Sequence, residues 1–507
     1  MKNITNVLEY LEYSVERFPD KLAYIDAKCS YTFSELNQKV CAVGSALCSA
    51  VKKGCPVAVY MEKSVQQIAA FLGVISAGAF YSPIDVDMPM QRVKLILDTL
   101  ETEVVISDSH NEPKLRDAGF TGTIYVFENI EQTEPDFEQL AKIRRSVIDG
   151  DPLYAIFTSG STGTPKGVLT SQRSAINFTE WYCSVFDFSD AEIFGNQTPF
   201  YFDASVKDIY ATLRCGATMY IIPKTLFSFP VKLIEYLNER KINCIDWVPS
   251  ALCHIVNFNT FDKIMPQYLK KVMFLGEVMP TKQFNMWRRA LPDIQYANLY
   301  GPTEATGDCT YYKVTRELRD DEPIPIGYAC ENSDVLILNE KNELAENGEI
   351  GEICVRGVSL ALGYYNNPEK TDEVFVQNPL QKHYKELIYR TGDLGRYNEY
   401  GEILYAARKD FQIKHMGHRI ELGEIETAVN AVPGIRRVCC LYDTQKNKII
   451  CIYEGEVTSV EIINTIKQAV PKYMIPNIYH AVNEMPVNMN GKIDRPRLTE
   501  EFIYGVD

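Results

Sequence analysis

The run from Thr158 to Gly167 is the stretch of this chain with the clearest chemical meaning. It combines hydroxyl side chains and glycines with one lysine, Lys166, directly after the apolar segment 154–157. Glycines let backbone N–H groups approach anionic oxygens closely, hydroxyls add donors, and a lysine adds a positive charge on a flexible stem. The run predicts a loop that wraps a polyphosphate. It is not a Walker A motif, because Pro165 precedes Lys166 where that motif has glycine.

Six further runs follow this loop in order along more than half of the chain. Each has an ordinary structural alternative if taken alone, since a Gly/Ser/Thr cluster is often a flexible surface loop and an Asn-Gly pair is often an exposed hairpin turn. Their occurrence together in one order makes those alternatives weak. The runs are 201–205 (YFDAS), 298–304 (NLYGPTE), 389–394 (YRTGDL), 408–414 (RKDFQIK), 417–426 (GHRIELGEIE) and 490–495 (NGKIDR).

This succession of motifs resembles the adenylate-forming superfamily over nearly the whole chain. That superfamily includes adenylation domains of nonribosomal peptide synthetases, D-alanine carrier-protein ligases, acyl-CoA synthetases and luciferases. Its members join a carboxylate to the α-phosphate of ATP, with pyrophosphate leaving, so catalysis is mainly positioning and neutralisation of negative charge. The resemblance implies an enzyme that uses ATP and Mg2+.

The resemblance also implies roles for individual residues. Lys166 would neutralise phosphate charge, Thr303 would donate to the α-phosphate, and Glu304 would hold Mg2+, which pairs one or two carboxylates with substrate phosphates. Lys492 would bridge the substrate carboxylate and the charge that develops on phosphorus. The other residues implied in nucleotide binding are Thr158, Ser159, Gly160, Ser161, Thr162, Gly163, Asn298, Leu299, Tyr300, Gly301, Asp393 and Arg408.

Within that set, Asp393 would accept from the ribose hydroxyls beside Arg408, and Asn298 and Tyr300 would face the adenine. Structural alternatives stay open at each carboxylate. Asp393 could fix a turn, and Glu304 could cap a helix that starts near Thr303.

The resemblance places an amino-acid pocket around Asp203, which would pair with the α-ammonium of the substrate. The start and end of the pocket sequence resemble glutamate-activating domains, whereas its middle does not, and L-glutamate is the predicted substrate. The predicted lining residues are Asp203, Ala204, Lys207, Asp246, Met273, Leu275, Leu299, Gly307, Asp308 and Lys492.

Lys207 is central to the glutamate prediction, because a buried ammonium needs a partner and a γ-carboxylate would supply one. Two alternatives remain. Lys207 is four residues after Asp203 and could pair with it along a helix for only about 0.3–0.5 kcal/mol. Asp246 or Asp308 could instead neutralise the lysine.

The elements that must position these residues alternate along the chain. Thr32 and Glu35 have capping-box spacing before a predicted helix 35–50. Helices then alternate with β-rich runs such as 57–60, 104–106 and 218–222, and the apolar window 68–81 reads as a buried helix leading into a strand. This predicts an α/β fold with mainly parallel sheets. From 323 to 365 the pattern becomes strand-rich and predicts a β-barrel-like subdomain.

A chain of 507 residues exceeds what one hydrophobic core usually holds, so at least two domains are expected. By resemblance, Asp410 is the hinge between a large N-terminal domain, 1–409, and a smaller α+β lid, 410–507. Strands at 438–442 and 448–453 and a helix at 459–469 are predicted in the lid. Lid closure would exclude water and complete the site.

Composition excludes several classes of function. The net charge is −15, which argues against a nucleic-acid partner. Neither a targeting sequence nor a membrane span is evident, and the fourteen cysteines have no metal-ligand spacing. A cytoplasmic protein with reduced thiols is expected.

The resemblance implies an acceptor for the activated acyl group. Neither a carrier module nor a condensation motif is evident, so the chain is expected to be a stand-alone enzyme that loads a phosphopantetheinyl carrier protein in trans. Alternatives are a D-alanyl or other amino-acid carrier-protein ligase, an acyl-CoA synthetase, or a catalytically silent adenylate-binding protein. One departure from the family pattern is Ala407, where glycine is common before Arg408.

Overall fold

The computed structural model describes residues 4–160, 164–487 and 493–505, and its chain contacts form two compact units. The first unit comprises Met1–Val86, Leu100–Phe157 and Gly167–Lys409. The second comprises Asp87–Thr99, Thr158–Lys166 and Asp410–Asp507.

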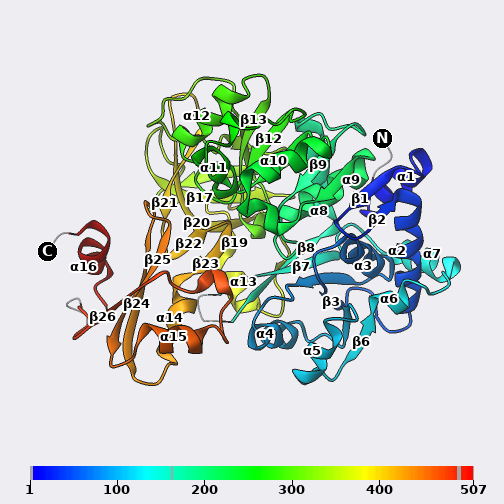
Figure 1. Ribbon diagram of the computed structural model, residues 1–507, viewed down its shortest axis with the longest axis horizontal. Helices are drawn as coiled ribbons and strands as arrows, with labels where there is room; N and C mark the ends of the chain where they lie inside the picture. Colours follow the sequence, from blue (N-terminus) through cyan, green and yellow to red (C-terminus); the bar gives the residue numbers. More distant parts are fainter. Residues whose placement is uncertain (1–3, 161–163, 488–492, 506–507) are drawn as a thin grey trace. The chain divides into compact units, whose positions relative to one another are not determined.

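Parallel pairing dominates the two largest sheets within the described residues, which confirms the predicted α/β class (Figure 1). The nine-stranded sheet of the described residues runs in the order β15 (Tyr328–Ala329), β14 (Thr310–Lys313), β13 (Gln295–Tyr300), β12 (Lys271–Phe274), β11 (Cys244–Trp247), β9 (Ile193–Asn196), β10 (Thr218–Ile221), β1 (Leu22–Ile25), β2 (Ser30–Thr32). The seven-stranded sheet of the same described residues runs β18 (Gly363–Tyr364), β8 (Lys166–Ser171), β7 (Pro152–Thr158), β4 (Phe80–Ile84), β3 (Pro56–Tyr60), β5 (Val104–Ser107), β6 (Thr123–Val126).

The predicted strand-rich segment forms an antiparallel sheet that continues beyond residue 365. Its strands are β16 (Ser333–Leu338), β17 (Gly351–Gly357), β19 (Phe375–Gln377), β20 (Leu387–Tyr397) and β21 (Ile403–Arg408). The helices outside the C-terminal segment are α1 (Leu8–Arg17), α2 (Phe33–Leu47), α3 (Val65–Ser76), α4 (Met90–Leu100), α5 (Glu112–Asp117), α6 (Phe127–Ile130), α7 (Phe137–Ser146), α8 (Gln172–Val185), α9 (Ala204–Cys215), α10 (Pro230–Glu239), α11 (Pro249–Asn257), α12 (Thr281–Ala290) and α13 (Pro368–Val374).

The C-terminal segment of the second unit mixes strands and helices, as predicted. Strands β24 and β25 pair antiparallel, and β25 pairs with β26 in parallel. Its elements are β22 (Gln412–His415), β23 (His418–Glu421), α14 (Leu422–Asn430), β24 (Ile435–Asp443), β25 (Lys448–Gly455), α15 (Ser459–Ile466), β26 (Ile478–Val482) and α16 (Arg495–Thr499).

Local signals in the sequence located several elements closely. The Thr32–Glu35 capping box forms with both of its hydrogen bonds, although α2 begins at Phe33, two residues before the predicted start. The apolar window 68–81 is the buried helix α3 followed by β4, as predicted. In the described residues, no helix combines the length and the apolar character that crossing a membrane requires.

Strands β11, β12 and β13 divide their side chains between two apolar cores. Ile245, Trp247 and Phe274 face a core shared with α10, α11 and α12. Alternate residues point the other way, so Met273 and Leu299 belong to a core shared with α8 and α9. Side chains on this second face therefore lie between the sheet and those two helices.

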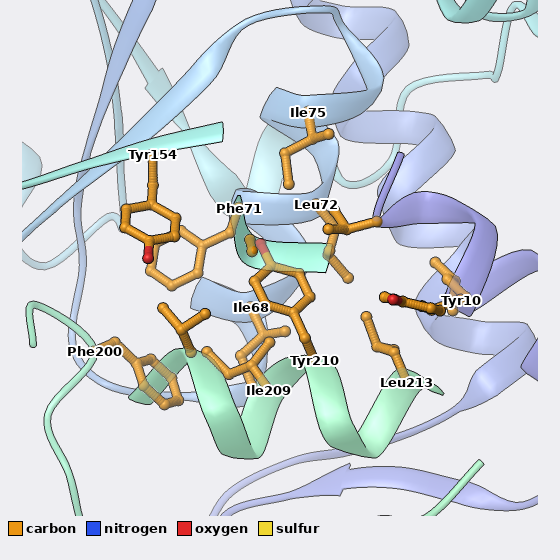
Figure 2. Close-up of a cluster of buried hydrophobic side chains, with 14 of the residues drawn as sticks. Tyr10, Ile68, Phe71, Leu72, Ile75, Tyr154, Phe200, Ile209, Tyr210 and Leu213 are labelled. Carbon is orange, nitrogen blue, oxygen red and sulfur yellow. The ribbon is translucent and has the colours of Figure 1, made fainter. Parts of the chain in front are cut away.

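Helix α9 is buried along nearly its whole length, its polar residues included. Its apolar residues recur at three- and four-residue spacing, so they share one face of the helix. The Tyr210 hydroxyl shares a hydrogen bond of 3.2 Å with that of Tyr81. Figure 2 shows the packing, in which Ile209, Tyr210 and Leu213 of α9 lie among Tyr10, Ile68, Phe71, Leu72, Ile75, Tyr154 and Phe200. Because this packing holds α9 in place, it also fixes the position of Lys207, which lies on a different face of the helix.

Candidate active site

Asp203 forms the N-cap of α9. Its carboxylate accepts from the backbone N–H of Ala204 at 2.9 Å and from the Thr303 hydroxyl. Burial raises the pKa of Asp203, and the Thr303 hydrogen bond opposes the rise. The structure thus brings together the residue predicted to bind an α-ammonium and the residue predicted to bind the α-phosphate.

Glu304 lies in the short 3-10 helix η3 (Thr303–Ala305) and is fully buried. Its Oε1 accepts a hydrogen bond of 2.6 Å from the hydroxyl of Tyr364. The described residues contain no group of three or more His, Cys, Asp or Glu side chains that could hold a metal alone. A single held carboxylate fits Mg2+, which takes its remaining oxygens from substrate phosphates and water.

Two glycines set the backbone that carries Asp308. A side chain at Gly301 would meet the carbonyl oxygen of Gly307 at 2.0 Å, so the two segments approach closely only because residue 301 has no Cβ. Gly307 has a φ of +88°, a conformation that favours glycine. These constraints place Asp308 beside β11 and α9.

The ammonium of Lys207 lies between two carboxylates. Its Nζ is 2.6 Å from Asp246 Oδ2 and 3.1 Å from Asp308 Oδ2, and the three side chains are at most 1% exposed. These are the ion pairs of Lys207 within 4.0 Å among the described residues, so the alternative of a pair with Asp203 along α9 is not adopted. Although burial opposes it, the two carboxylates raise the pKa of Lys207 above its ordinary value.

The three side chains, called the buried charge cluster below, carry one net negative charge when all are ionised. Asp246 Oδ2 also accepts a hydrogen bond of 3.1 Å from the Tyr182 hydroxyl. Asp246 Oδ1 and Asp308 Oδ1 have no hydrogen-bond donor among the described residues. Buried polar oxygens are nearly always paired, so these two acceptors are suited to a bound group.

The remaining predicted pocket residues surround this cluster from the sheet. Met273 stands opposite Asp246 in the parallel β11–β12 pair, and Leu275 and Leu299 extend the same face. All three are buried apolar side chains. Gly307 lies against the ring of Phe178 on α8, and Ala204 is the first residue of α9. The strand residues of the predicted pocket thus share one face of the sheet.

A second arrangement joins three residues predicted to bind nucleotide. The Tyr300 hydroxyl donates to Asp393 Oδ2 at 2.6 Å, and Arg408 Nη1 donates to Asp393 Oδ1 at 2.8 Å. Asp393 lies in strand β20, so it does not serve as a turn residue. Asn298, two residues before Tyr300 in β13, donates to the carbonyl of Pro325 at 2.8 Å.

The described part of the phosphate loop belongs to the second unit. The Ser159 hydroxyl donates to the carbonyl of Arg419 at 2.8 Å, and Lys166 lies 3.8 Å from Glu421. A side chain at Gly160 would meet the carbonyl oxygen of Thr164 at 2.0 Å, so residues 160 and 164 approach closely only because residue 160 has no Cβ. Asp410 begins the C-terminal segment of the unit, where it accepts from the N–H of Gln412. Predicted site residues outside the described residues are Ser161, Thr162, Gly163 and Lys492.

Sequence reasoning missed three residues that support the site. Tyr182 orients Asp246 and Tyr364 orients Glu304, yet no motif singles out either tyrosine. Asp208, adjacent to Lys207, is buried and accepts from Asn196 Nδ2 at 2.8 Å. Burial raises the pKa of Asp208 to about 7.

The raised pKa of Asp208 predicts a pH dependence of stability. The folded state binds this proton more tightly than the unfolded chain does. The contribution of Asp208 to stability is therefore complete below about pH 4 and is lost as pH rises through about 7. The Asp208→Asn variant should therefore unfold at a higher temperature than the native protein at pH 8, by a stability gain of up to the order of 4 kcal/mol. The gain should fall to less than half of this near pH 5 and vanish below about pH 4.

Thermal unfolding at pH 5, 6.5 and 8 measures this difference. The exposed Asp293 supplies a matched control, because Asp293→Asn removes the same charge without changing a buried group. A gain for Asp208→Asn that is the same at every pH would contradict the titration of Asp208.

Comparisons with known proteins bear on the family. The model of a family described as AMP-binding enzyme matches residues 11–365. The chain is 33% identical to the D-alanine–D-alanyl carrier protein ligase of Listeria innocua, covering 98% of this chain and 99% of that protein. It is 32% identical to tyrocidine synthase 1 of Brevibacillus parabrevis over 98% of this chain, but spans only 45% of that longer protein.

Solved structures share the fold. The Vibrio cholerae adenylation domain AlmE, solved with glycyl-adenosine-5'-phosphate, superposes with a TM-score of 0.83 at 20% identity and covers 98% of both chains. NpsA-ThdA, an artificially fused adenylation–PCP di-domain from Klebsiella oxytoca, gives a TM-score of 0.81 at 21% identity over 94% of both chains.

Proposed function

The chain belongs to the AMP-binding enzyme family of adenylate-forming ligases, and on that premise we propose that it activates L-glutamate as glutamyl-AMP and transfers it to the phosphopantetheine thiol of a carrier protein. Adenylate-forming activation of an amino acid is the general reaction. Glutamate and the carrier protein are the specific part of the proposal. The observation that supports adenylation of an amino acid is the contact between Asp203 and Thr303.

That contact matters because adenylation joins a carboxylate to the α-phosphate. An α-ammonium held by Asp203 would bring the α-carboxylate, which is attached to the same carbon, toward Thr303. Holding both reactants in this geometry converts a bimolecular step into an effectively unimolecular one. A fatty acid has no ammonium for Asp203 to bind, which favours an amino acid over an acyl-CoA synthetase substrate.

Several of the predicted residues would hold the nucleotide. Asp393, fixed by Tyr300 and Arg408, offers carboxylate oxygens to ribose hydroxyls. Lys166 and the loop 158–163 would neutralise the phosphates. Glu304 would hold Mg2+, which when bound lowers the negative charge on the phosphates. Lys492 would approach the α-phosphate from the C-terminal domain, 410–507, by rotation about Asp410.

Glutamate is proposed because its γ-carboxylate would pair with the ammonium of Lys207. The cluster already supplies two carboxylates to that ammonium, so glutamate adds a third. A buried excess of negative charge is costly unless a proton or a donor enters with the substrate. An amino acid with a neutral hydrogen-bond donor on its side chain, such as glutamine, is the alternative, because it adds no negative charge to the cluster.

The acceptor is proposed from the relatives. One is named as a D-alanyl carrier protein ligase and covers almost the same length, and a structural neighbour fuses an adenylation domain to a carrier domain. D-alanine is therefore a second candidate substrate. Free coenzyme A presents the same pantetheine thiol and is the alternative acceptor.

We expect L-glutamate to give the strongest Mg2+-dependent ATP–pyrophosphate exchange in a panel of amino acids, with aspartate and glutamine weaker. The panel should include D-alanine, glycine and a medium-chain fatty acid. Loading of a phosphopantetheinyl carrier protein, compared with coenzyme A, then tests the acceptor. Strong exchange with the fatty acid alone would overturn the proposed function, whereas strong exchange with another amino acid would replace only glutamate.

A further inference from the structure

The buried charge cluster already holds more negative than positive charge, which makes it difficult for the cluster to accept a further carboxylate. Lys207 contributes one positive charge, and Asp246 and Asp308 contribute two negative charges at 2.6 and 3.1 Å from it. A glutamate γ-carboxylate would change the net charge of this buried cluster from −1 to −2. Two like charges at hydrogen-bond distance in a buried site rarely both ionise, because one of the two acids keeps its proton.

Asp308 is the member of the cluster best suited to hold that proton. Asp246 Oδ2 lies closer to the ammonium, at 2.6 Å, and also accepts a hydrogen bond from the Tyr182 hydroxyl. Asp308 has the longer contact with Lys207, and its Oδ1 lacks a donor among the described residues. Burial already raises the pKa of Asp308 to about 6, with Lys207 opposing the rise.

Charged and titratable groups face Asp308 from each element that packs against it. Helix α9 presents Lys207 together with Asp203 and Asp208, which are negative when ionised. Strand β11 presents Asp246. The other titratable neighbours are Tyr182 of α8 and Cys330, which follows β15. Apart from Lys207 these neighbours are anionic or neutral, so they oppose a second ionised carboxylate.

We propose that the enzyme binds L-glutamate together with one proton from solvent, which Asp308 takes up so that its carboxylic acid donates a hydrogen bond to the γ-carboxylate of the substrate. The inference rests on the proposed function. It makes Asp308 the residue that lets an acidic cluster accept an acidic side chain. Glutamine, whose side chain is neutral, binds without the proton.

Proton uptake can be measured on the native protein. Glutamate is titrated calorimetrically into the enzyme with Mg2+ and α,β-methylene-ATP, in phosphate and in Tris buffer at pH 8. The difference in heat between the two buffers counts protons. We expect about one proton taken up per glutamate and none per glutamine, whose α-groups are the same. Near pH 5, Asp308 is already protonated and uptake of protons should approach zero.

The exchange reaction gives a second readout. Between about pH 6 and 8 the KM for glutamate should rise about tenfold for each pH unit, as expected for uptake of one proton, whereas the KM for glutamine should stay level. Asp308→Asn should remove the slope for glutamate, because an asparagine amide is neutral at every pH. The control Asp293→Asn should keep the slope.

The outcomes separate this inference from the proposed function. Equal proton counts for glutamate and glutamine, with glutamate active in exchange, would overturn the role of Asp308 and leave the function standing. Exchange with glutamine or another donor-bearing amino acid alone would overturn the inference and reassign the substrate. Exchange with no amino acid at any pH would overturn the proposed function itself.

Discussion

Replacement of Lys492 by alanine should lower the rate of adenylate formation by a factor on the order of 10²–10³ or more, while largely sparing thioester formation from a supplied aminoacyl adenylate. The physical reason is that negative charge develops on phosphorus only in the first step. An ammonium aimed at that charge stabilises the transition state of adenylation. In the second step the thiol attacks the acyl carbon and AMP leaves, so no bond to phosphorus forms and a lysine at the attacked phosphorus is not needed.

Two measurements separate the half-reactions. Single-turnover formation of the adenylate from ATP and amino acid reports the first step, and loading of carrier protein from synthetic adenylate reports the second. Lys472→Ala is the matched control, since Lys472 is an exposed lysine of the same C-terminal segment. Equal losses in both steps would show that Lys492 supports the fold of the domain instead of the chemistry.

Local patterns in the sequence predicted those features of the structure that depend on neighbours in the chain. The Thr32–Glu35 spacing located the start of α2 to within two residues, because a capping box is formed within four residues. The apolar window 68–81 predicted α3 and β4, because burial on all sides leaves a continuous apolar run. Such features depend on helix capping and on burial, which the sequence displays directly.

Contacts between residues far apart in the chain could not be predicted in the same way. Resemblance to a family selected Asp203, Lys207, Asp246 and Asp308 as pocket residues, but it left three partners open for Lys207. The structure selects Asp246 and Asp308, because β11 and the glycine-bounded loop at 307 bring both carboxylates to the same side of α9. The supporting tyrosines at 182 and 364 carry no local signal at all.

Lys207→Gln should shift the preference of the enzyme from glutamate toward glutamine. The ammonium that meets the γ-carboxylate is lost, at a cost of roughly 2–5 kcal/mol, or about 30-fold to several-thousand-fold in kcat/KM for glutamate. The new side-chain amide can hydrogen-bond the neutral amide of glutamine. Asp246 and Asp308 also lose their cation and repel a third carboxylate further.

The same substitution should destabilise the protein, because it leaves two buried carboxylates without a positive partner. Removing one member of a buried ion pair costs about 3–5 kcal/mol of stability. The glutamate-to-glutamine ratio of kcat/KM is therefore the decisive measurement, since both values come from one sample and the folded fraction cancels. Thermal unfolding of the variant records the loss of stability separately.

Lys271 provides the matched control for this change. It lies at the start of β12, partly buried, and its Nζ is 2.7 Å from Glu192, so Lys271→Gln also removes a lysine from a partly buried ion pair. It should lower stability without altering the ratio, because its partner is not in the buried charge cluster. An unchanged ratio in Lys207→Gln would mean that the cluster does not contact the substrate side chain. In that case the lysine would serve only to neutralise Asp246 and Asp308, and the case for glutamate would lose its physical basis.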